Sequence, residues 1–348
     1  MTFSRAVEIV NRSLRSFDIA IVRRSHYLEK TKEADVSQYR NRFVVKPIAP
    51  DAGEYLRSDN PLLVEYKRRY EGHPATVHSV WKTRHIETQV SLSSFRADNA
   101  YIWQSRDIKL NPLISYAFTA YYVKDIDALG LMGKLDEDGS FGAISFTMDM
   151  DNGKTVSRDL LDSIWEINFL ERHLKLSNMP SVTVLDIGAG YGRLAYRVAK
   201  SLPNLKIILC ADAVPESTFL CQYYLNYRGV SDRAKAVPLD TIEEVLPNSI
   251  DIVTNIHSFQ ECTFASISWW LDVISRREIK YFMLAHYKDE LLSREPDGTV
   301  RDFRPLLEMK GFKLVSKESV YAPYTLASTY GLYPDRWYYL FLNERILS

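Results

Sequence analysis

Hydrophobic and polar positions change their rhythm along the chain near residue 156. Upstream, apolar residues recur at helical spacing in patches such as 60–72 and 111–135, and residues 137–149 have the pattern of a turn followed by a short strand. Downstream, compact apolar runs alternate with runs of helical period, which predicts strands and helices in turn. The seven strand-like runs cover residues 182–188, 206–212, 234–239, 250–256, 280–286, 312–320 and 337–343.

This alternation predicts an α/β fold with a seven-stranded, mostly parallel sheet and helices on both faces. The last two strand-like runs have no long helix between them, so we expect them to form an antiparallel pair at one edge of the sheet, with the last strand antiparallel to the rest. A helix is predicted over residues 157–174, with Ser157 as its N-cap. We therefore divide the chain into a mostly helical N-terminal region, residues 1–150, and an α/β domain, residues 151–348.

The composition indicates a folded protein of more than one part. The 348 residues are 46% hydrophobic, which is enough to bury a core. Lys and Arg number 44, as do Asp and Glu, so no excess charge favours nucleic acid as a partner. The three cysteines follow no metal-ligand spacing, and so sparse and odd a set is typical of reduced thiols. We therefore expect a cytoplasmic protein.

The first 26 residues do not have the pattern of a signal peptide, because charged side chains interrupt the apolar positions. These charged residues are Arg5, Glu8, Arg12 and Arg15. No later stretch is long and apolar enough to cross a bilayer. We expect a helix that packs on its own domain; the alternative is a basic helix that makes weak peripheral contact with an anionic membrane.

Three glycines, Gly188, Gly190 and Gly192, stand where the first strand of the α/β domain passes into a helix. Glycine tolerates positive φ and has no Cβ, so a ligand can approach the backbone at the start of the helix. The spacing is tighter than in the dinucleotide-binding fingerprint, and no Gly-Lys-Ser/Thr follows to make a P-loop. Such a turn is also typical of a tight strand-to-helix connection in any α/β protein.

Acidic residues at three strand ends make the glycine turn a more specific indication of a ligand-binding site. Asp212 ends the second strand, about 20 residues after the turn, where a carboxylate can accept both hydroxyl hydrogens of a ribose. Asp186 ends the first strand and would face a cationic group at the other end of the ligand. Asp240 follows the third strand; it could accept from an adenine amino group, or it could cap the helix that follows.

Residues 184–192, VLDIGAGYG, together with the acid of residues 210–212, resemble class I S-adenosylmethionine-dependent methyltransferases. The resemblance covers about residues 155–348 and implies the Rossmann-like methyltransferase fold. It also implies S-adenosyl-L-methionine as the cofactor and S-adenosyl-L-homocysteine as the product. The residues that it places at the cofactor are Asp186, Gly188, Ala189, Gly190, Tyr191, Gly192, Asp212, Asp240 and Asn255.

A narrower resemblance extends into the N-terminal region. The segments that carry it resemble a family of bacterial sugar O-methyltransferases and are residues 55–70, 156–170, 186–197, 221–229 and 255–261. It implies methyl transfer to a hydroxyl of a sugar, on a surface glycan or a glycosylated metabolite. Residues 1–150 would then bind the acceptor or act as a lid over the site.

Polar side chains crowd the segment after the fourth strand, residues 255–261, where ligands of a doubly wound sheet bind. A sugar hydroxyl is a poor nucleophile until a base removes its proton, and histidine titrates near neutrality. We predict His257 as the base, with Glu261 orienting its ring or acting as the base itself. The alternative for His257 is a capping or packing role.

Other features of the sequence leave alternatives open. A divalent metal is not favoured, because a single glutamate follows the fourth strand. The carboxylates of Asp289 and Glu290 are the alternative, as candidate ligands of a metal ion. Trp81 and Trp103 are candidates for stacking on a sugar, against a packing role. The acceptor could be a small molecule other than a sugar, or the chain could be a catalytically silent partner in a glycan-assembly complex. An oligomeric state is compatible with each of these hypotheses.

Overall fold

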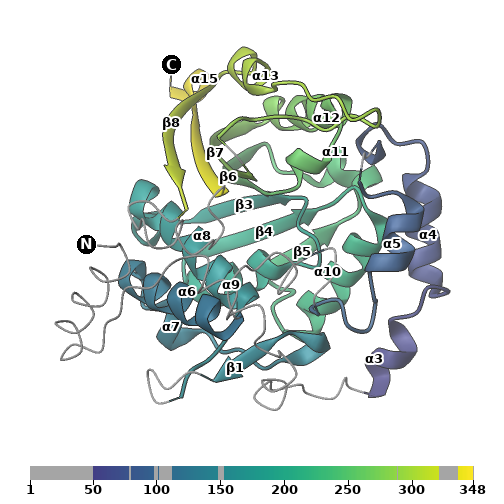
Figure 1. Cartoon of the computed structure of the whole chain (residues 1–348). Coiled ribbons are helices and arrows are strands. Elements are labelled where there is room, and N and C mark those ends of the chain that lie inside the picture. The colour runs from purple at the N-terminus through teal and green to yellow at the C-terminus, as the bar shows by residue number, and fades with distance from the viewer. Residues whose placement is uncertain are drawn as a thin grey trace, which may run out of the picture.

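The computed structural model describes residues 50–77, 80–97, 101, 112–147, 153–287, 289–320 and 336–347. The predicted basic N-terminal helix and Trp103 lie outside these residues, so the predictions made for them are not addressed by the structure. Figure 1 shows a twisted central sheet with helices packed on both sides of it, which is the layered arrangement that the alternation of runs predicts.

The sheet has seven strands in the order β5-β4-β3-β6-β7-β9-β8. Their bounds are β3 Val182–Ile187, β4 Leu205–Ala211, β5 Ala234–Val237, β6 Ser249–Ile256, β7 Glu278–Tyr287, β8 Phe312–Ser319 and β9 Arg336–Asn343. The first five are mutually parallel, and β9 runs antiparallel between β7 and β8. The predicted fold class is therefore confirmed, including the reversed last strand, and this is a Rossmann-like methyltransferase fold.

Alternate residues of the central strands enter two separate cores, one on each face of the sheet. Val184 packs with one helical layer and its neighbour Leu185 with the other, as expected for a strand buried on both faces. The first layer contains α6 (Pro112–Ile126), α8 (Arg158–Leu174), α9 (Arg193–Ser201) and α10 (Pro215–Tyr227). The second layer consists of α11 (Ile242–Val245), α12 (Phe264–Ser275) and α13 (Arg304–Met309).

Helix α8 begins where the sequence predicts. Ser157 has extended backbone, and its Oγ accepts from the backbone N–H of Leu160 at 3.1 Å, which is the N-cap hydrogen bond. Because α8 leads directly into β3, its first turn lies at the edge of the sheet where the parallel strands end. This places polar residues of that turn beside the glycine turn.

The described part of the N-terminal region is largely helical. Its elements are α3 (Pro50–Tyr55), α4 (Pro61–Tyr70), η3 (Pro74–Thr76), α5 (Thr83–Gln89), α7 (Leu131–Lys134), η4 (Ser140–Gly142) and a two-stranded ribbon of β1 (Ser145–Thr147) and β2 (Thr155–Ser157). In Figure 1 α4 lies along α10 (Pro215–Tyr227). Leu63 and Tyr66 of α4 share a core with Phe219 and Tyr224 of α10, so this region packs firmly on the α/β domain.

A buried ion network joins the two parts of the chain. The fully buried Arg96 donates from Nη2 to Glu137 at 2.7 and 2.8 Å and from Nε to Asp159 at 2.9 Å. Arg197 of α9 also donates to Glu137, at 3.1 Å. Burial would raise the pKa of Glu137, but the two arginines outweigh it and lower the value to about 2. Removing one member would leave a buried charge uncompensated.

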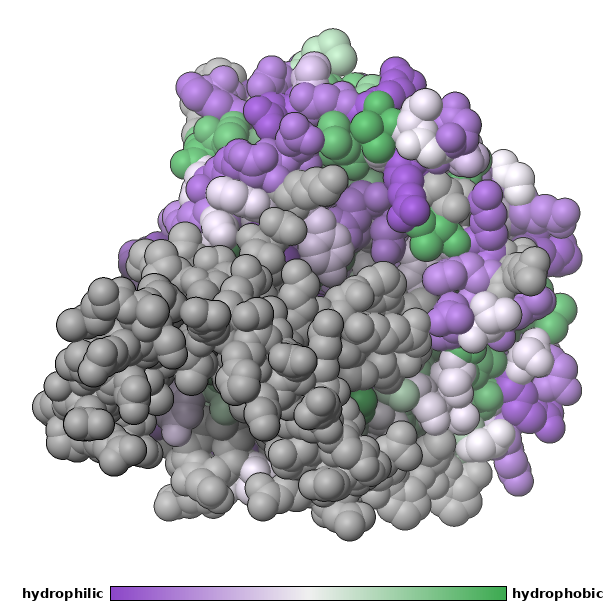
Figure 2. Space-filling model, in the orientation of Figure 1, coloured by the Kyte–Doolittle hydropathy of each residue, from purple (hydrophilic) through white to green (hydrophobic). Residues whose placement is uncertain are grey.

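The described surface in Figure 2 is mainly hydrophilic, with apolar residues in small, separate groups. Exposed apolar side chains of the described residues include Leu314 and Val315 on the edge strand β8, whose pairing with β9 is interrupted between Leu314 and Ser316. An irregular edge of this kind opposes pairing with another sheet. None of the helices formed by the described residues is both long and apolar enough to cross a membrane.

Candidate functional site

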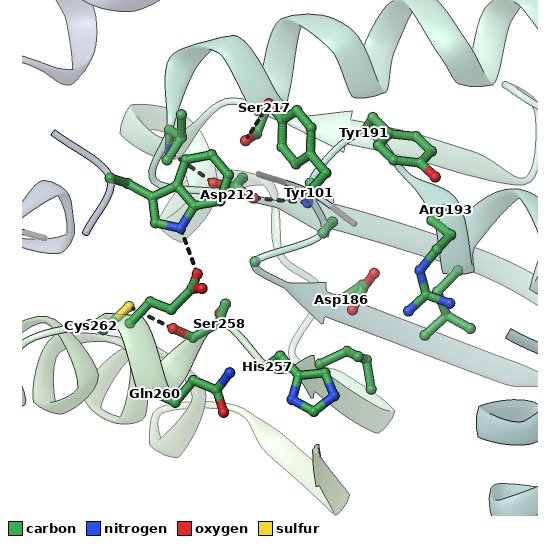
Figure 3. A pocket seen from close by; sticks show the side chains of 18 of the residues that line it. Tyr101, Asp186, Tyr191, Arg193, Asp212, Ser217, His257, Ser258, Gln260 and Cys262 are labelled. Carbon is green, nitrogen blue, oxygen red and sulfur yellow. Dashed lines mark hydrogen bonds between the residues drawn. The ribbon is translucent and has the colours of Figure 1, made fainter. Parts of the chain in front are cut away.

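A cavity of about 190 Å³ opens at the edge of the sheet where β3, β4 and β6 end. Figure 3 shows Asp212 and Tyr101 at one end of it and His257 and Gln260 at the other. The residues predicted for the site that line this cavity are Asp186, Gly188, Ala189, Gly190, Tyr191, Asp212, His257 and Glu261. Gly192, Asp240 and Asn255 are not among its lining residues.

The three glycines of the turn all have positive φ, at 72°, 56° and 85° in chain order. A Cβ on Gly188 would lie 2.1 Å from Ser258 Oγ, so this glycine lets the turn approach the loop after β6. A Cβ on Gly192 would lie 3.0 Å from Cys221 Sγ, which fits a role in helix packing. Gly190 borders the cavity, where its Cβ would meet the Tyr101 ring at 3.2 Å.

Asp212 is held in place by backbone donors. Its two carboxylate oxygens accept from Gly190 N–H at 2.9 Å and from Val214 N–H at 2.8 Å. Burial raises the pKa of Asp212 to about 6, although these N–H groups and Ser217 act in the opposite direction. Each carboxylate oxygen has a second lone pair. The carboxylate lines the cavity, where it can accept from the hydroxyl groups of a vicinal diol.

Asp186 is buried at the end of β3 and accepts from Thr254 Oγ1 at 2.7 Å. Burial raises its pKa to about 7, against the opposing effects of Thr254 and the more distant Arg193. The Arg193 guanidinium itself donates to Glu166 at 2.8 Å and to Ser163 at 2.8 Å. A cationic ligand group beside Asp186 would offset the cost of keeping this carboxylate ionised.

This raised pKa leads to a prediction for Asp186→Asn. The folded protein holds the Asp186 proton more tightly than the unfolded chain. Protonated Asp186 therefore adds to the free energy of unfolding below about pH 4, and this contribution is lost as pH rises through about 7. At pH 8 the substitution should therefore raise the free energy of unfolding by about 1–3 kcal/mol, since one pKa unit is worth about 1.4 kcal/mol. Cofactor binding should be lost.

Urea unfolding at pH 5 and pH 8 without cofactor checks this expectation. Asp232→Asn, at an exposed position, is the matched control and should change stability little at either pH. A loss of stability by Asp186→Asn at both pH values would mean that the carboxylate is a structural acceptor for Thr254 instead.

His257 has a strained backbone, with φ at +65°. Positive φ is uncommon outside glycine, and such residues gather at functional sites. The His257 N–H donates to Ala285 O at 3.0 Å, and the ring stacks on Tyr287 with 4.6 Å between centroids. Burial lowers the pKa of His257 well below its usual range, and the neighbouring Arg336 adds to the effect. The imidazole is therefore neutral at pH 7 and able to accept a proton.

Glu261 accepts from Trp81 Nε1 at 2.6 Å. Burial raises the pKa of Glu261 to about 7, although the Trp81 hydrogen bond opposes this. The His257 ring is positioned by Tyr287, and its Nδ1 is buried without a hydrogen bond to any described residue. Among the described contacts, none joins Glu261 to His257, so the hypothesis that Glu261 orients the His257 ring has no direct support. Glu261 is itself a titratable group that lines the cavity.

The side chains of three predicted cofactor residues bind other parts of the protein. Asn255 Nδ2 donates to Ile187 O at 3.0 Å and to Ser258 Oγ at 2.6 Å, so it ties the end of β3 to the loop after β6. The Tyr191 hydroxyl donates to Asp159, which directs its side chain into the core. Asp240 accepts from Arg69 Nε at 2.8 Å, outside the cavity, and caps no helix.

Several cavity residues that could contact a ligand were not predicted as site residues from the sequence, although Trp81 was a candidate for sugar stacking. Among them are Trp81, Tyr101, Arg158, Asp162 and Arg336. The predicted topology could have located Arg158 and Arg336. Arg158 begins the helix that precedes the first parallel strand, and Arg336 begins the strand that runs in reverse. Both elements begin at the edge of the sheet where ligands bind. Trp81 and Tyr101 come from the N-terminal region, and no local pattern places them here.

A metal centre is not evident in the part of the chain that the structure describes. No group of three or more His, Cys, Asp or Glu side chains is placed there to hold a metal ion. His286, near the end of β7, is buried with its ring nitrogens 2.6 Å from Tyr287 O and 3.2 Å from Leu292 O.

Comparison with known families adds to this geometry. Residues 158–265 match the methyltransferase small domain. The matched stretch contains the glycine turn, Asp186, Asp212, His257 and Glu261, and it supports S-adenosylmethionine-dependent methyl transfer as the general activity. A comparison with curated proteins finds no match.

Solved structures of methyltransferases resemble the chain at low identity. A SAM-dependent methyltransferase from Aquifex aeolicus is 18% identical with a TM-score of 0.35, over 50% of this chain and 88% of that one. Magnesium protoporphyrin IX methyltransferase from Synechocystis PCC 6803 with bound SAM is 12% identical with a TM-score of 0.38, over 65% of this chain and 97% of that one. Likeness at this level says nothing about the acceptor.

Proposed function

We propose that this protein transfers a methyl group from S-adenosylmethionine to a hydroxyl group of a sugar. The observation that carries the cofactor part of the proposal is the pairing of Asp186 and Asp212 across a glycine turn, in one cavity at the switch point of the sheet. The match to the methyltransferase small domain spans the same residues. The sugar acceptor rests on the narrower sequence resemblance and on the cavity's side chains.

The residues present fit the cofactor chemically. Asp212 lines the cavity with a carboxylate that can accept from ribose hydroxyls, and Asp186 is a buried carboxylate suited to the cationic amino-acid end. Gly190 leaves the cavity wall free of a side chain. When bound, S-adenosylmethionine supplies a methyl group on a positively charged sulfur.

The protein's own part in the reaction is to hold the acceptor hydroxyl and remove its proton. With the cofactor bound, the acceptor oxygen would bond to the methyl carbon while the carbon–sulfur bond breaks with its electron pair on sulfur, so the protein has to take up the hydroxyl proton. His257 takes the hydroxyl proton on a ring nitrogen. Its depressed pKa keeps it neutral at pH 7, ready for this step. Glu261, with a pKa of about 7, is the second candidate base.

The cavity offers groups that suit a sugar. Trp81 and Tyr101 present aromatic rings, 5.4 Å apart between centroids, which can pack against the C–H face of a pyranose. Gln260 and Glu261 offer hydrogen-bonding atoms nearby. Because both rings come from residues before 150, they support a role for the N-terminal region in acceptor binding. A non-sugar acceptor and a catalytically silent partner remain the competing hypotheses.

Trp81→Ala should raise the KM for the acceptor about two- to tenfold, in line with the worth of an aromatic contact. Trp81→Phe is the matched variant, because it keeps a ring and loses only the hydrogen bond to Glu261. It should restore most of the acceptor affinity. Steady-state kinetics at saturating cofactor provide the measurement, and an equal loss in both variants would show that the hydrogen bond matters and the ring does not.

The acceptor is tested by supplying radiolabelled S-adenosylmethionine with nucleotide sugars, free glycosides and non-sugar hydroxyl compounds. Transfer to glycosides alone supports the sugar acceptor, and transfer only to the non-sugar compounds refutes it. The cytoplasmic location also stays a proposal. It is supported by three cysteines that are free and buried, Cys210, Cys221 and Cys262.

A further inference from the structure

The side chain of Gln260 lines the cavity at the end where His257 lies, away from Asp212 (Figure 3). Its Oε1 accepts from the backbone N–H of Tyr287 at 2.8 Å. Because a backbone N–H can only donate, this contact fixes which end of the amide is the oxygen. Nε2 is then the other end. It keeps its N–H donors, and no hydrogen bond joins it to a residue that the structure describes.

The loop that carries this amide is held at several points. His257, with φ at +65°, turns the chain at the end of β6, and the short helix η7 (Phe259–Glu261) follows. Asn255 Oδ1 accepts from the Phe259 N–H at 3.0 Å, and the buried Phe259 ring packs edge-on against Phe282. A backbone fixed in this way presents the amide to the cavity in one place, as a ligand-binding group requires.

Tyr287 joins the amide to the proposed base. Its backbone N–H binds Gln260, and its ring stacks on the His257 imidazole with 4.6 Å between centroids. The side chains of Gln260 and His257 both line the cavity. A ligand whose hydroxyl lies at His257 therefore has the Gln260 amide as a neighbour.

The chemistry of the amide nitrogen favours a neutral oxygen as its partner. Nε2 carries no charge and can only donate, so it suits hydroxyl and ether oxygens. An alcohol with a single oxygen would use that oxygen at His257 and leave the Nε2 donors without a partner, which costs binding free energy. A sugar brings further oxygens on nearby carbons, and a second contact also limits how the sugar can rotate in the cavity.

We propose that Gln260 determines acceptor specificity by donating from Nε2 to a second oxygen of the sugar, a hydroxyl or the ring oxygen, while the hydroxyl to be methylated lies at His257. This inference rests on the proposed function and names a residue that selects its acceptor. It gives the two ends of one amide separate tasks, because Oε1 holds Tyr287 and Nε2 binds the sugar.

The first test uses the methyl hexoside with the highest turnover in the acceptor screen, at saturating S-adenosylmethionine. It is compared with its monodeoxy derivatives, each of which lacks one hydroxyl, and with its carbocyclic analogue, which lacks the ring oxygen. Loss of the methylated hydroxyl abolishes transfer. Loss of the oxygen that Gln260 binds should lower kcat/KM about two- to tenfold, the usual worth of a neutral hydrogen bond. That compound is the sensitive analogue.

Gln260→Glu separates the two tasks of the amide. It keeps an oxygen for the Tyr287 N–H and puts an oxygen that cannot donate where Nε2 was. Transfer to the hexoside should fall about 5- to 100-fold in kcat/KM, and the preference for the hexoside over the sensitive analogue should vanish. Any effect of the added charge on His257 acts on both acceptors and cancels in that preference.

Gln260→Met is the matched variant, because it loses both contacts. It should also remove the preference for the hexoside. If the amide only holds Tyr287, Gln260→Glu will behave like the parent protein and Gln260→Met will slow transfer to every acceptor alike. That pair of results would overturn the inference.

The remaining outcomes separate this inference from the proposed function. The affinity for S-adenosylhomocysteine should be unchanged in Gln260→Glu, and a parallel loss would place the amide at the cofactor and overturn the inference. If the parent protein methylates the hexoside and the preference survives in Gln260→Glu, the inference fails and the proposed function stands. If the parent protein binds S-adenosylmethionine but methylates no sugar, the sugar acceptor fails and this inference fails with it.

Discussion

Replacing His257 by alanine should lower the rate of methyl transfer by about 10²- to 10⁴-fold, the usual contribution of a positioned general base. The Kd for S-adenosylmethionine should stay nearly unchanged, because the cofactor's proposed contacts lie with Asp186, Gly190 and Asp212. His257→Gln separates hydrogen bonding from proton transfer, since glutamine can bind the hydroxyl but cannot take its proton. It should be nearly as slow as the alanine variant. Single-turnover rates at saturating cofactor provide the measurement.

The pH dependence of kcat distinguishes His257 from Glu261 as the base. A base must be deprotonated, so the rate falls as pH drops through its pKa. For His257 this fall should lie well below the ordinary histidine value of about 6.5, whereas for Glu261 it should lie near 7. Saturating cofactor removes the contribution of Asp186 to binding. A fall near 7 that persists in His257→Ala and vanishes in Glu261→Gln would reverse our assignment.

Gly190→Val should abolish S-adenosylmethionine binding while the protein remains folded. Gly190 has φ at +56° and borders the cavity, so a side chain there would project towards Tyr101 and the proposed cofactor space. Isothermal calorimetry measures the binding, and circular dichroism checks the fold.

The matched control for this variant is Gly229→Val. Gly229 has a similar φ of +63°, but a Cβ there would meet no atom within 4 Å. It imposes the same backbone strain on an exposed turn away from the cavity. The control should bind the cofactor like the parent protein. If Gly190→Val also bound normally, the cofactor would not lie against the glycine turn.

The fold could be predicted from the sequence because each strand has its own local pattern of apolar residues. The buried parallel strands appear as short apolar runs in the sequence. No long run of helical period separates the last two of these runs, which predicts the reversed strand β9. Ser157 forms the predicted cap because the capping hydrogen bond spans only three residues. Local signals of this kind need no knowledge of distant contacts.

The site could be predicted only in part, because much of it depends on distant partners. The glycine turn, Asp186 and Asp212 lie at strand ends, which the sequence locates. Asp240 also lies at a strand end, but Arg69, 171 residues away, binds it outside the cavity. Trp81 reaches Glu261 across 180 residues. Such pairs arise from packing of the N-terminal region on the α/β domain, which no local pattern encodes.

The central claim, that this chain binds S-adenosylmethionine in the cavity between Asp186 and Asp212, is tested most directly by calorimetric titration of the cofactor into the purified protein. We expect saturable binding of one equivalent, weakened in Asp212→Ala by about 1–3 kcal/mol through the lost hydrogen bonds to the ribose. A folded parent protein that takes up no cofactor at millimolar concentration, or an Asp212→Ala variant that binds like the parent, would contradict the account.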